Sequence, residues 1–175
     1  MTVQFSAPTL TTPRLTLRAP RIDDFDAVAA FYASPRSEFV GGPISAELAW
    51  RTLAQEAGHW VLRGFGRWTV VETATQTPVG IVGLWCPEGF PENELGWDLF
   101  EGATGKGYAT EAATAARQHA YDTLGWRTLI SLVAHENHAS RKVAQRLGAH
   151  HDGDFTHERW GPLQIWRHPG PEALT

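Results

Sequence analysis

The chain has 175 residues, of which 42% are hydrophobic and 19% charged, and this composition is typical of a globular protein rather than a disordered one. Its formal net charge is -4 and no block of Lys or Arg stands out, so we expect no nucleic-acid partner. One cysteine, Cys86, excludes an internal disulfide, and no signal peptide or membrane span is readable. We therefore expect one cytoplasmic domain, residues 1–175, without a membrane partner.

The first third of the chain predicts one short strand and two helices. A strand at residues 15–18 precedes apolar side chains that recur at helical spacing over residues 23–32, and Pro35 lies just beyond that helix. Ser45 can cap a second helix, which we expect to end before Gly64. We also expect most of the eight tryptophans to fill or flank the core.

The middle of the chain predicts three strands in succession. Residues 67–72 and 79–85 are rich in β-branched and aromatic side chains and are separated by a polar stretch, which favours a hairpin. In residues 94–100 the large apolar side chains Leu95, Trp97 and Leu99 alternate, as in a strand with one buried face.

The last third predicts a helix over residues 108–123, a strand over 128–133, a helix over 138–147, and weaker strands over 150–155 and 164–167. We therefore expect an α/β (α+β) fold around a mixed, mostly antiparallel sheet of about seven strands with flanking helices. Its one parallel step should be the central strand pair that the long helix connects.

The segment Gly105-Lys106-Gly107-Tyr108-Ala109 links the central strand to the long helix. Two glycines would let a phosphate approach the main chain, and the helix start adds free N–H groups and a positive dipole end. The same pattern is also that of an ordinary tight turn. A P-loop is excluded because Gly107 follows Lys106, and a dinucleotide fingerprint because Thr110 stands where a third glycine is required.

Three blocks, residues 94–97, 105–112 and 137–149, resemble those of the GNAT acetyltransferases in this order and spacing. With the opening residues 11–18, the chain is similar to the RimJ/RimL-type ribosomal-protein N-acetyltransferase branch over roughly residues 10–168. The resemblance implies a GNAT fold with a splayed central strand pair. It also implies acetyl-CoA as the cofactor, with coenzyme A as the product.

The resemblance assigns the cofactor to the loop and to the neighbouring strand and helix. Phosphates would bind the loop main chain, and the pantetheine arm would pair with the exposed main chain of residues 97–99. Asn137 would hold the pantetheine amide, although it can equally serve as a helix cap. The cofactor-binding set is therefore Trp97, Asp98, Leu99, Gly102, Gly105, Lys106, Gly107, Tyr108, Ala109, Asn137 and Ser140.

Gly102 departs from the family pattern, which has Gln or Arg three residues before the first loop glycine. One side-chain contact is therefore missing, and we expect this to affect cofactor affinity rather than cofactor identity.

The same resemblance implies direct transfer, with no acyl-enzyme. Ser140 would donate a proton or hydrogen bond to the departing thiolate, with the Tyr108 hydroxyl or a water as alternatives. Glu94 and Glu158 are the candidate general bases, although either can equally be a solvated surface carboxylate. His135 and His138 are possible proton relays, but they lack the spacing of a His-Glu-x-x-His zinc helix, so we expect no metal.

The sequence predicts an N-acetyltransferase that acts on a primary amine, either a protein N-terminus or a small molecule. A non-catalytic acyl-CoA sensor and a protein-interaction module with exposed tryptophans are the alternatives. Residues 31–50 and 156–163, which would shape the acceptor site, contain no motif that selects one amine, one acyl group or one general base. A monomer and a homodimer are both compatible with the sequence.

Overall fold

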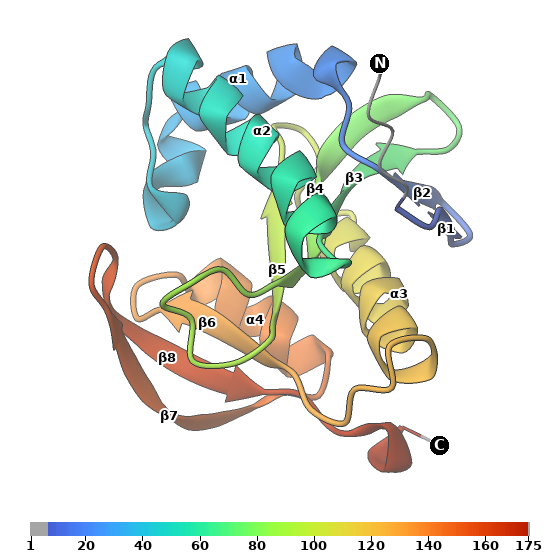
Figure 1. The fold of residues 1–175 in the computed structure, drawn as a ribbon, viewed down its shortest axis with the longest axis vertical. Coiled ribbons are helices and arrows are strands. Elements are labelled where there is room, and N and C mark those ends of the chain that lie inside the picture. Colours follow the sequence, from blue (N-terminus) through green and yellow to red (C-terminus); the bar gives the residue numbers. More distant parts are fainter. Residues whose placement is uncertain (1–6, 175) are drawn as a thin grey trace.

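One eight-stranded sheet forms the centre of the computed structural model, which describes residues 7–174 (Figure 1). The expected domain ends at residues 1 and 175 lie outside these described residues. Along the sheet the strands follow the order β1-β2-β3-β4-β5-β6-β8-β7. Their bounds are β1 Leu10–Thr11, β2 Leu15–Arg18, β3 Arg67–Glu72, β4 Thr77–Trp85, β5 Glu94–Leu99, β6 Ile130–Ala134, β7 His150–His157 and β8 Gly161–Arg167.

The strand pairing confirms the mixed, mostly antiparallel sheet that the sequence predicts. Neighbouring strands pair in antiparallel fashion except β5 and β6, which are parallel and are connected through the long helix. The strand beyond the seven expected is β1, which pairs Leu10 with Leu17 and Thr11 with Thr16 of β2. Two residues are too few to show an alternating pattern in the sequence.

The four α-helices also lie where the sequence predicts them: α1 Phe25–Ala33, α2 Ala46–Arg63, α3 Tyr108–Asp122 and α4 His138–Arg146. Ser45 caps α2 by accepting a hydrogen bond from the Leu48 N–H at 3.4 Å, and Gly64 ends it at a φ of 75°. Sequence patterns missed three short 3-10 helices, η1 Ile22–Asp24, η2 Pro35–Val40 and η3 Pro171–Ala173. Within residues 7–174, none of the helices has both the length and the apolar character that a membrane span requires.

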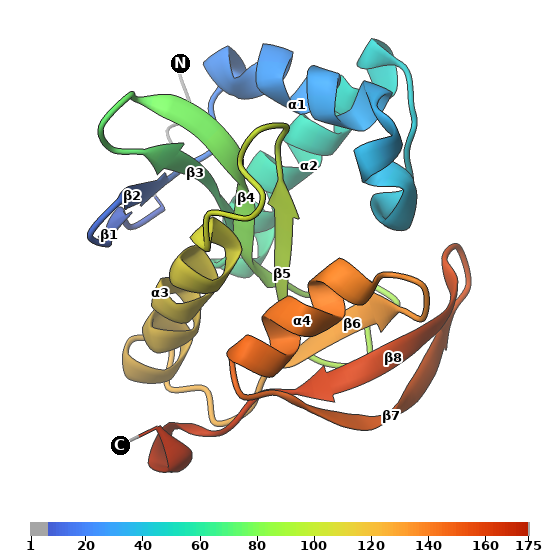
Figure 2. The ribbon, with the colours of Figure 1, turned by 180° about the vertical axis from the view of Figure 1, so that it is seen from behind.

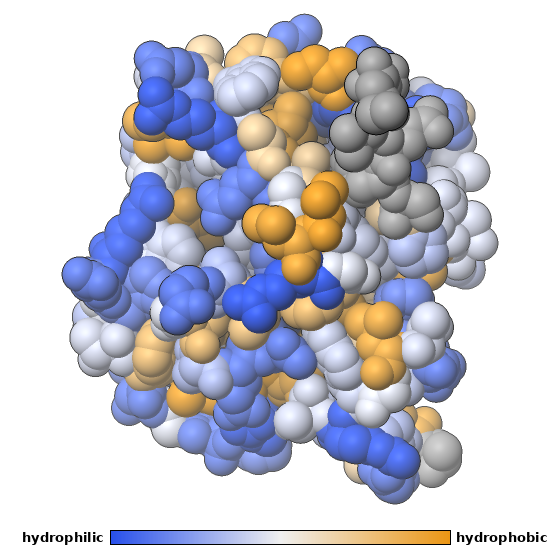
Figure 3. Space-filling model, viewed as in Figure 1, coloured by the Kyte–Doolittle hydropathy of each residue, from blue (hydrophilic) through white to orange (hydrophobic). Residues whose placement is uncertain are grey.

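The helices form a layer on each face of the sheet, with α1 and α2 on one face and α3 and α4 on the other (Figures 1 and 2). Small side chains at Ala112, Ala116 and Ala120 are fully buried, which lets α3 lie close to the strands. The outer face of α2 keeps exposed apolar side chains at Val61 and Leu62 (Figure 3). Seven of the eight tryptophans are buried or half-buried, as expected, and Trp50 is exposed.

The parallel strands β5 and β6 separate almost as soon as they meet. Their register contains the single pair Glu94 and Ile130, and beyond it the two strands diverge. Side chains bridge the gap in place of a main-chain ladder. The Ser131 hydroxyl donates to the Leu95 carbonyl at 2.5 Å, and the Leu132 N–H donates to the Glu94 carboxylate at 3.0 Å. The main chain that follows on β5 is therefore open toward β6.

A buried cluster of charges ties α2 to the sheet. Arg67 on β3 forms ion pairs with Glu56 on α2 and, at 2.7 Å, with Asp98 on β5. The side chains of Glu56 and Asp98 are 1% and 5% exposed. Because both carboxylates are largely removed from water, they depend on the one guanidinium for their neutralisation.

We expect the substitution Arg67→Gln to lower the free energy of unfolding by about 3–5 kcal/mol, because it leaves two buried carboxylates without their cation. Arg51→Gln is the matched control, since Arg51 pairs with Glu47 on the surface of α2 at side-chain exposures of 66% and 75%. It should cost no more than about 0.5 kcal/mol. Urea unfolding at pH 7 measures both, and equal losses would contradict a special role for the buried cluster.

Candidate functional site

The loop between β5 and α3 is shaped to bind an anion with its main chain. Gly105 and Gly107 adopt φ angles of 78° and 82°, in the left-handed region that glycine favours. A Cβ at Gly105 would meet no atom within 4 Å, so the main chain is accessible there. Gly107 is the N-cap of α3 and no side chain caps that end, which leaves the first N–H groups free for a ligand.

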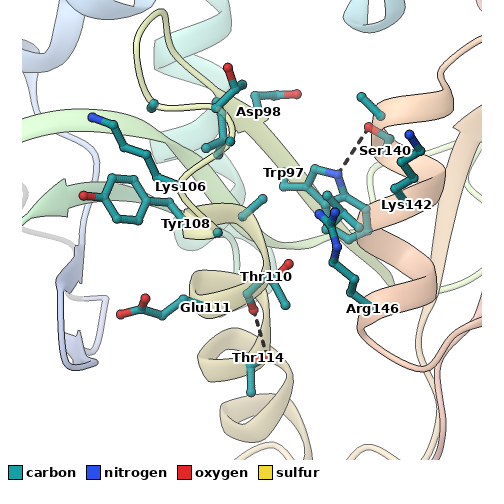
Figure 4. A pocket seen from close by; sticks show the side chains of 18 of the residues that line it. Trp97, Asp98, Lys106, Tyr108, Thr110, Glu111, Thr114, Ser140, Lys142 and Arg146 are labelled. Carbon is teal, nitrogen blue, oxygen red and sulfur yellow. Dashed lines mark hydrogen bonds between the residues drawn. The ribbon is translucent and has the colours of Figure 1, made fainter.

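Arg14 holds this loop in place. Its guanidinium donates to the Lys106 carbonyl at 2.9 Å and to the Glu111 carboxylate at 2.7 Å. Glu111 lies in the first turn of α3, where its negative charge would repel an anionic ligand. Arg14 and the Thr12 hydroxyl both bind its carboxylate, and this reduces the repulsion. The Tyr108 hydroxyl donates to Glu72 and points away from Ser140 (Figure 4). Of the two candidate hydroxyls, the structure therefore places that of Ser140 beside Trp97.

A large cavity, here called cavity A, lies between this loop, α3 and α4 and has a volume of about 1270 Å³. Every predicted cofactor-binding residue lines it except Gly102, which is exposed in the loop with a φ of 74°. Sequence reasoning missed Arg36, Lys142 and Arg146, which also line it. Lys142 and Arg146 are one helical turn apart on α4 and point into the cavity (Figure 4), and neither forms an ion pair with the described residues.

Ser140 and Asn137 meet Trp97 at the inner end of cavity A. The Trp97 indole N–H donates to the Ser140 hydroxyl oxygen at 3.3 Å (Figure 4), which leaves the Ser140 proton free to be donated to a ligand. The Asn137 side-chain oxygen accepts from the Ser140 N–H at 3.1 Å, so Asn137 does cap α4. Its side-chain nitrogen, Nδ2, forms no hydrogen bond with the described residues.

A second cavity, cavity B, has a volume of about 310 Å³ and lies on the α1–α2 side of β5. The face of β5 that carries Glu94, Gly96 and Asp98 forms its floor, whereas Leu95 packs toward α3 on the other face. The cavities meet where β5 and β6 separate, and residues that line both are Phe39, Val40, Trp97, Asp98, Asn137 and Ser140.

The two predicted bases differ sharply in position. Glu94 is half-buried on the floor of cavity B, and burial raises the pKa of its carboxyl to about 7, against the lowering effect of the Leu132 N–H. Glu158 is exposed in the turn between β7 and β8 and lines neither cavity. His135 and His138 are exposed as well and are not among the lining residues. Of the two predicted bases, only Glu94 lines a cavity, and that cavity is B.

Residues 14–150 match the acetyltransferase (GNAT) domain family. The crystal structure of the acetyltransferase from Agrobacterium tumefaciens str. C58 is 39% identical and superimposes with a TM-score of 0.85, covering 96% of this chain and 98% of that one. The uncharacterized N-acetyltransferase p20 of Bacillus licheniformis is 26% identical in a 151-residue alignment that covers 83% of this chain and 84% of p20.

A likeness of fold extends to RimL, a ribosomal L7/L12 α-N-protein acetyltransferase solved in complex with coenzyme A. The TM-score is 0.73 at 15% identity, over 93% of this chain and 98% of RimL.

The burial of Glu94 should make stability depend on pH. Its carboxyl has a pKa of about 7 in the folded chain against an ordinary value of 4.5, so the folded state holds a proton that the unfolded state releases. This contribution is present below about pH 4.5 and lost as the pH rises through 7. We expect the wild type to lose stability between pH 5 and pH 8 relative to Glu94→Gln in urea unfolding. The control Glu88→Gln, at an exposed lining carboxylate, should keep the wild-type slope, and parallel slopes for all three proteins would refute the assignment.

Proposed function

Because the chain belongs to the acetyltransferase (GNAT) family, we propose that it transfers the acetyl group of acetyl-CoA directly to a primary amine that enters through cavity B. One observation carries the proposal: cavities A and B meet at Trp97, Asp98 and Ser140, where the sheet opens. A site for one ligand alone would not need a second cavity that reaches the same three residues from the opposite face of the sheet.

Cavity A fits acetyl-CoA in charge, in shape and in hydrogen bonding. The free N–H groups at the start of α3, together with Lys106, Lys142 and Arg146, suit the phosphates. The open main chain of β5 suits the amide groups of an extended pantetheine arm, in the manner of an added strand. The family uses acetyl-CoA, and the coenzyme A complex of RimL supports the same ligand for this fold.

When bound, acetyl-CoA supplies an activated acyl group and a thiolate leaving group. In this proposal Ser140 donates its proton to the sulfur, and the bond from Trp97 to the Ser140 oxygen supports this role because it leaves that proton free. The open N–H groups of β5 near Trp97 can donate to the oxygen that gains charge during transfer. These groups act by hydrogen bonding, so no acyl-enzyme is needed.

Glu94 is the general base in this proposal. An amine attacks only when neutral, and an α-amino group titrates near about 8 whereas a lysine side chain titrates near about 10.4. Proton transfer to a carboxylate with a pKa of about 7 is uphill by about one pKa unit for an α-amine and by more than three units for lysine. The site therefore favours weakly basic amines over lysine side chains.

Acetyl-CoA should raise the melting temperature of the wild type, because it binds the folded state alone. Gly107→Val should abolish the shift by covering the main chain of the loop. The control is Gly125→Val, since Gly125 has a similar φ of 71° and lies after α3, outside both cavities. Both variants carry the same backbone strain, so a shift kept in both would show that the phosphates bind elsewhere, and a shift lost in both would show that strain, and not blocked access to the loop, abolishes binding.

Ser140→Ala should lower turnover by roughly ten- to a thousandfold while leaving the affinity for coenzyme A nearly unchanged, because the hydroxyl acts when sulfur gains charge. Ser45→Ala is the control, since this cap of α2 lines neither cavity and its loss should affect stability alone. Thiol release and equilibrium binding measure the two effects. Binding of acetyl-CoA without thiol release for any amine, in the wild type, would favour the non-catalytic sensor instead.

A further inference from the structure

Cavity B has an acidic floor. Four carboxylates and two arginines line it, which are Glu56, Glu88, Glu94, Asp98, Arg67 and Arg159. Glu94 and Asp98 lie two residues to either side of Gly96 on one face of β5, and Gly96 has no side chain to separate them. Because the arginines are outnumbered, this floor attracts a cationic ammonium group toward the junction.

The outer wall of cavity B is aromatic. Phe90 comes from the loop between β4 and β5, and His157 and Trp160 come from the hairpin of β7 and β8. The His157 and Trp160 rings stack with centroids 4.3 Å apart, and Phe90 meets each of them edge-on at 5.6 Å. All three side chains are only half-buried, so they offer ring surface to a ligand.

Trp160 also presents an unused hydrogen-bond donor. Its indole Nε1 is buried and donates to no acceptor among residues 7–174. It lies beside Gly41, another lining residue, where a Cβ would be 3.6 Å from it. Buried N–H groups are nearly always paired, so this one needs the oxygen of a ligand or of a water.

Three segments meet at this wall and limit the size of a ligand. Gly41 follows η2 and would place a Cβ 3.3 Å from the Arg159 guanidinium, and Phe90 packs edge-on against Trp160. The volume of about 310 Å³ is at the lower end for small-molecule sites. If the amine were the N-terminus of a folded protein, the rest of that protein would have to push these three segments apart for the amine to enter cavity B.

We propose that the acceptor is a small, weakly basic primary amine that carries an aromatic group and, close to the amine, a carbonyl oxygen. The ammonium group lies over the floor of Glu94 and Asp98, the ring lies against Phe90 and His157, and the oxygen accepts from Trp160. This inference rests on the proposed function, because it names the second substrate of that reaction.

Five amines test the proposal: phenylalaninamide, alaninamide, 2-phenylethylamine, spermidine and a decapeptide with N-terminal Phe. Thiol release with acetyl-CoA gives kcat/KM, and calorimetry with coenzyme A present gives binding without turnover. We expect phenylalaninamide to exceed alaninamide, which lacks the ring, and 2-phenylethylamine, which lacks the oxygen, by at least about tenfold in both measurements. Spermidine and the decapeptide should be poorer still.

Two substitutions separate the contributions of the ring and the donor. Trp160→Phe keeps a ring but removes the N–H, so it should reduce the advantage over 2-phenylethylamine to the part that the more basic amine of that compound explains, and should keep the advantage over alaninamide. Phe90→Ala should reduce the advantage over alaninamide. Trp50→Phe, at the exposed tryptophan of α2 outside both cavities, is the control and should change neither ratio.

The outcomes distinguish this inference from the reaction itself. Equal kcat/KM for alaninamide and phenylalaninamide, or a preference for spermidine or the decapeptide, overturns the acceptor class but keeps the acetyltransfer. Selective binding of phenylalaninamide without thiol release supports the class and counts against catalysis. Failure of phenylalaninamide both to bind and to react overturns the inference.

Discussion

The separation of β5 from β6 is the constraint on which the rest of the site depends. A continuous parallel ladder would close the sheet and keep its two faces apart, whereas here main-chain pairing stops after one register pair. Main-chain groups that lose their partners must still form hydrogen bonds. The Glu94 side chain on β5 binds the Leu132 N–H of β6, and the Ser131 side chain on β6 binds the Leu95 carbonyl of β5. Ser131 is in turn bonded to His168, whose pKa burial lowers to about 3, with a further lowering by Arg117. A neutral His168 can donate to Ser131 while facing the Arg117 cation, so the opening is built and held by side chains.

The same opening sorts charge between the two faces of the sheet. On the α3–α4 face the cations Lys106, Lys142 and Arg146 line the same cavity as the free N–H groups of a helix start, and the opposite face presents carboxylates, Glu94 and Asp98 among them. An anionic ligand and a cationic one are therefore drawn to different sides and meet only at the junction. In the proposed reaction, the burial that raises the pKa of Glu94 also weakens its hold on the ammonium, which favours proton transfer over a tight ion pair.

The sequence predicted the parts of the site whose signals are local. Alternation in residues 94–99, two glycines and a helix start lie within 15 residues, and these elements form as expected because each depends mainly on its own neighbours. The Glu56, Arg67 and Asp98 cluster joins three elements, and no spacing within one element encodes such a contact. Glu158 lines neither cavity because it lies in the turn between β7 and β8 and not in a strand, so the alternation of side chains along a strand does not apply to it. The shared position of Lys142 and Arg146 on one face of α4 could have been predicted from the sequence, because the two residues are four positions apart in the predicted helix.

The loop at cavity A and the wall of cavity B also differ in the interactions that form them. The loop side depends on main-chain N–H groups, two left-handed glycines and the Arg14 bonds, so it tolerates change at most of its exposed side chains. The cavity B wall depends on three loops, which carry Gly41, Phe90 and Trp160, and changing either ring alters the size, polarity or donor set of that wall. Loops accept such substitutions with little effect on the sheet beneath them. If the proposed function holds, acceptor choice can therefore change while cavity A is retained, so family membership and a matching fold do not by themselves determine the amine.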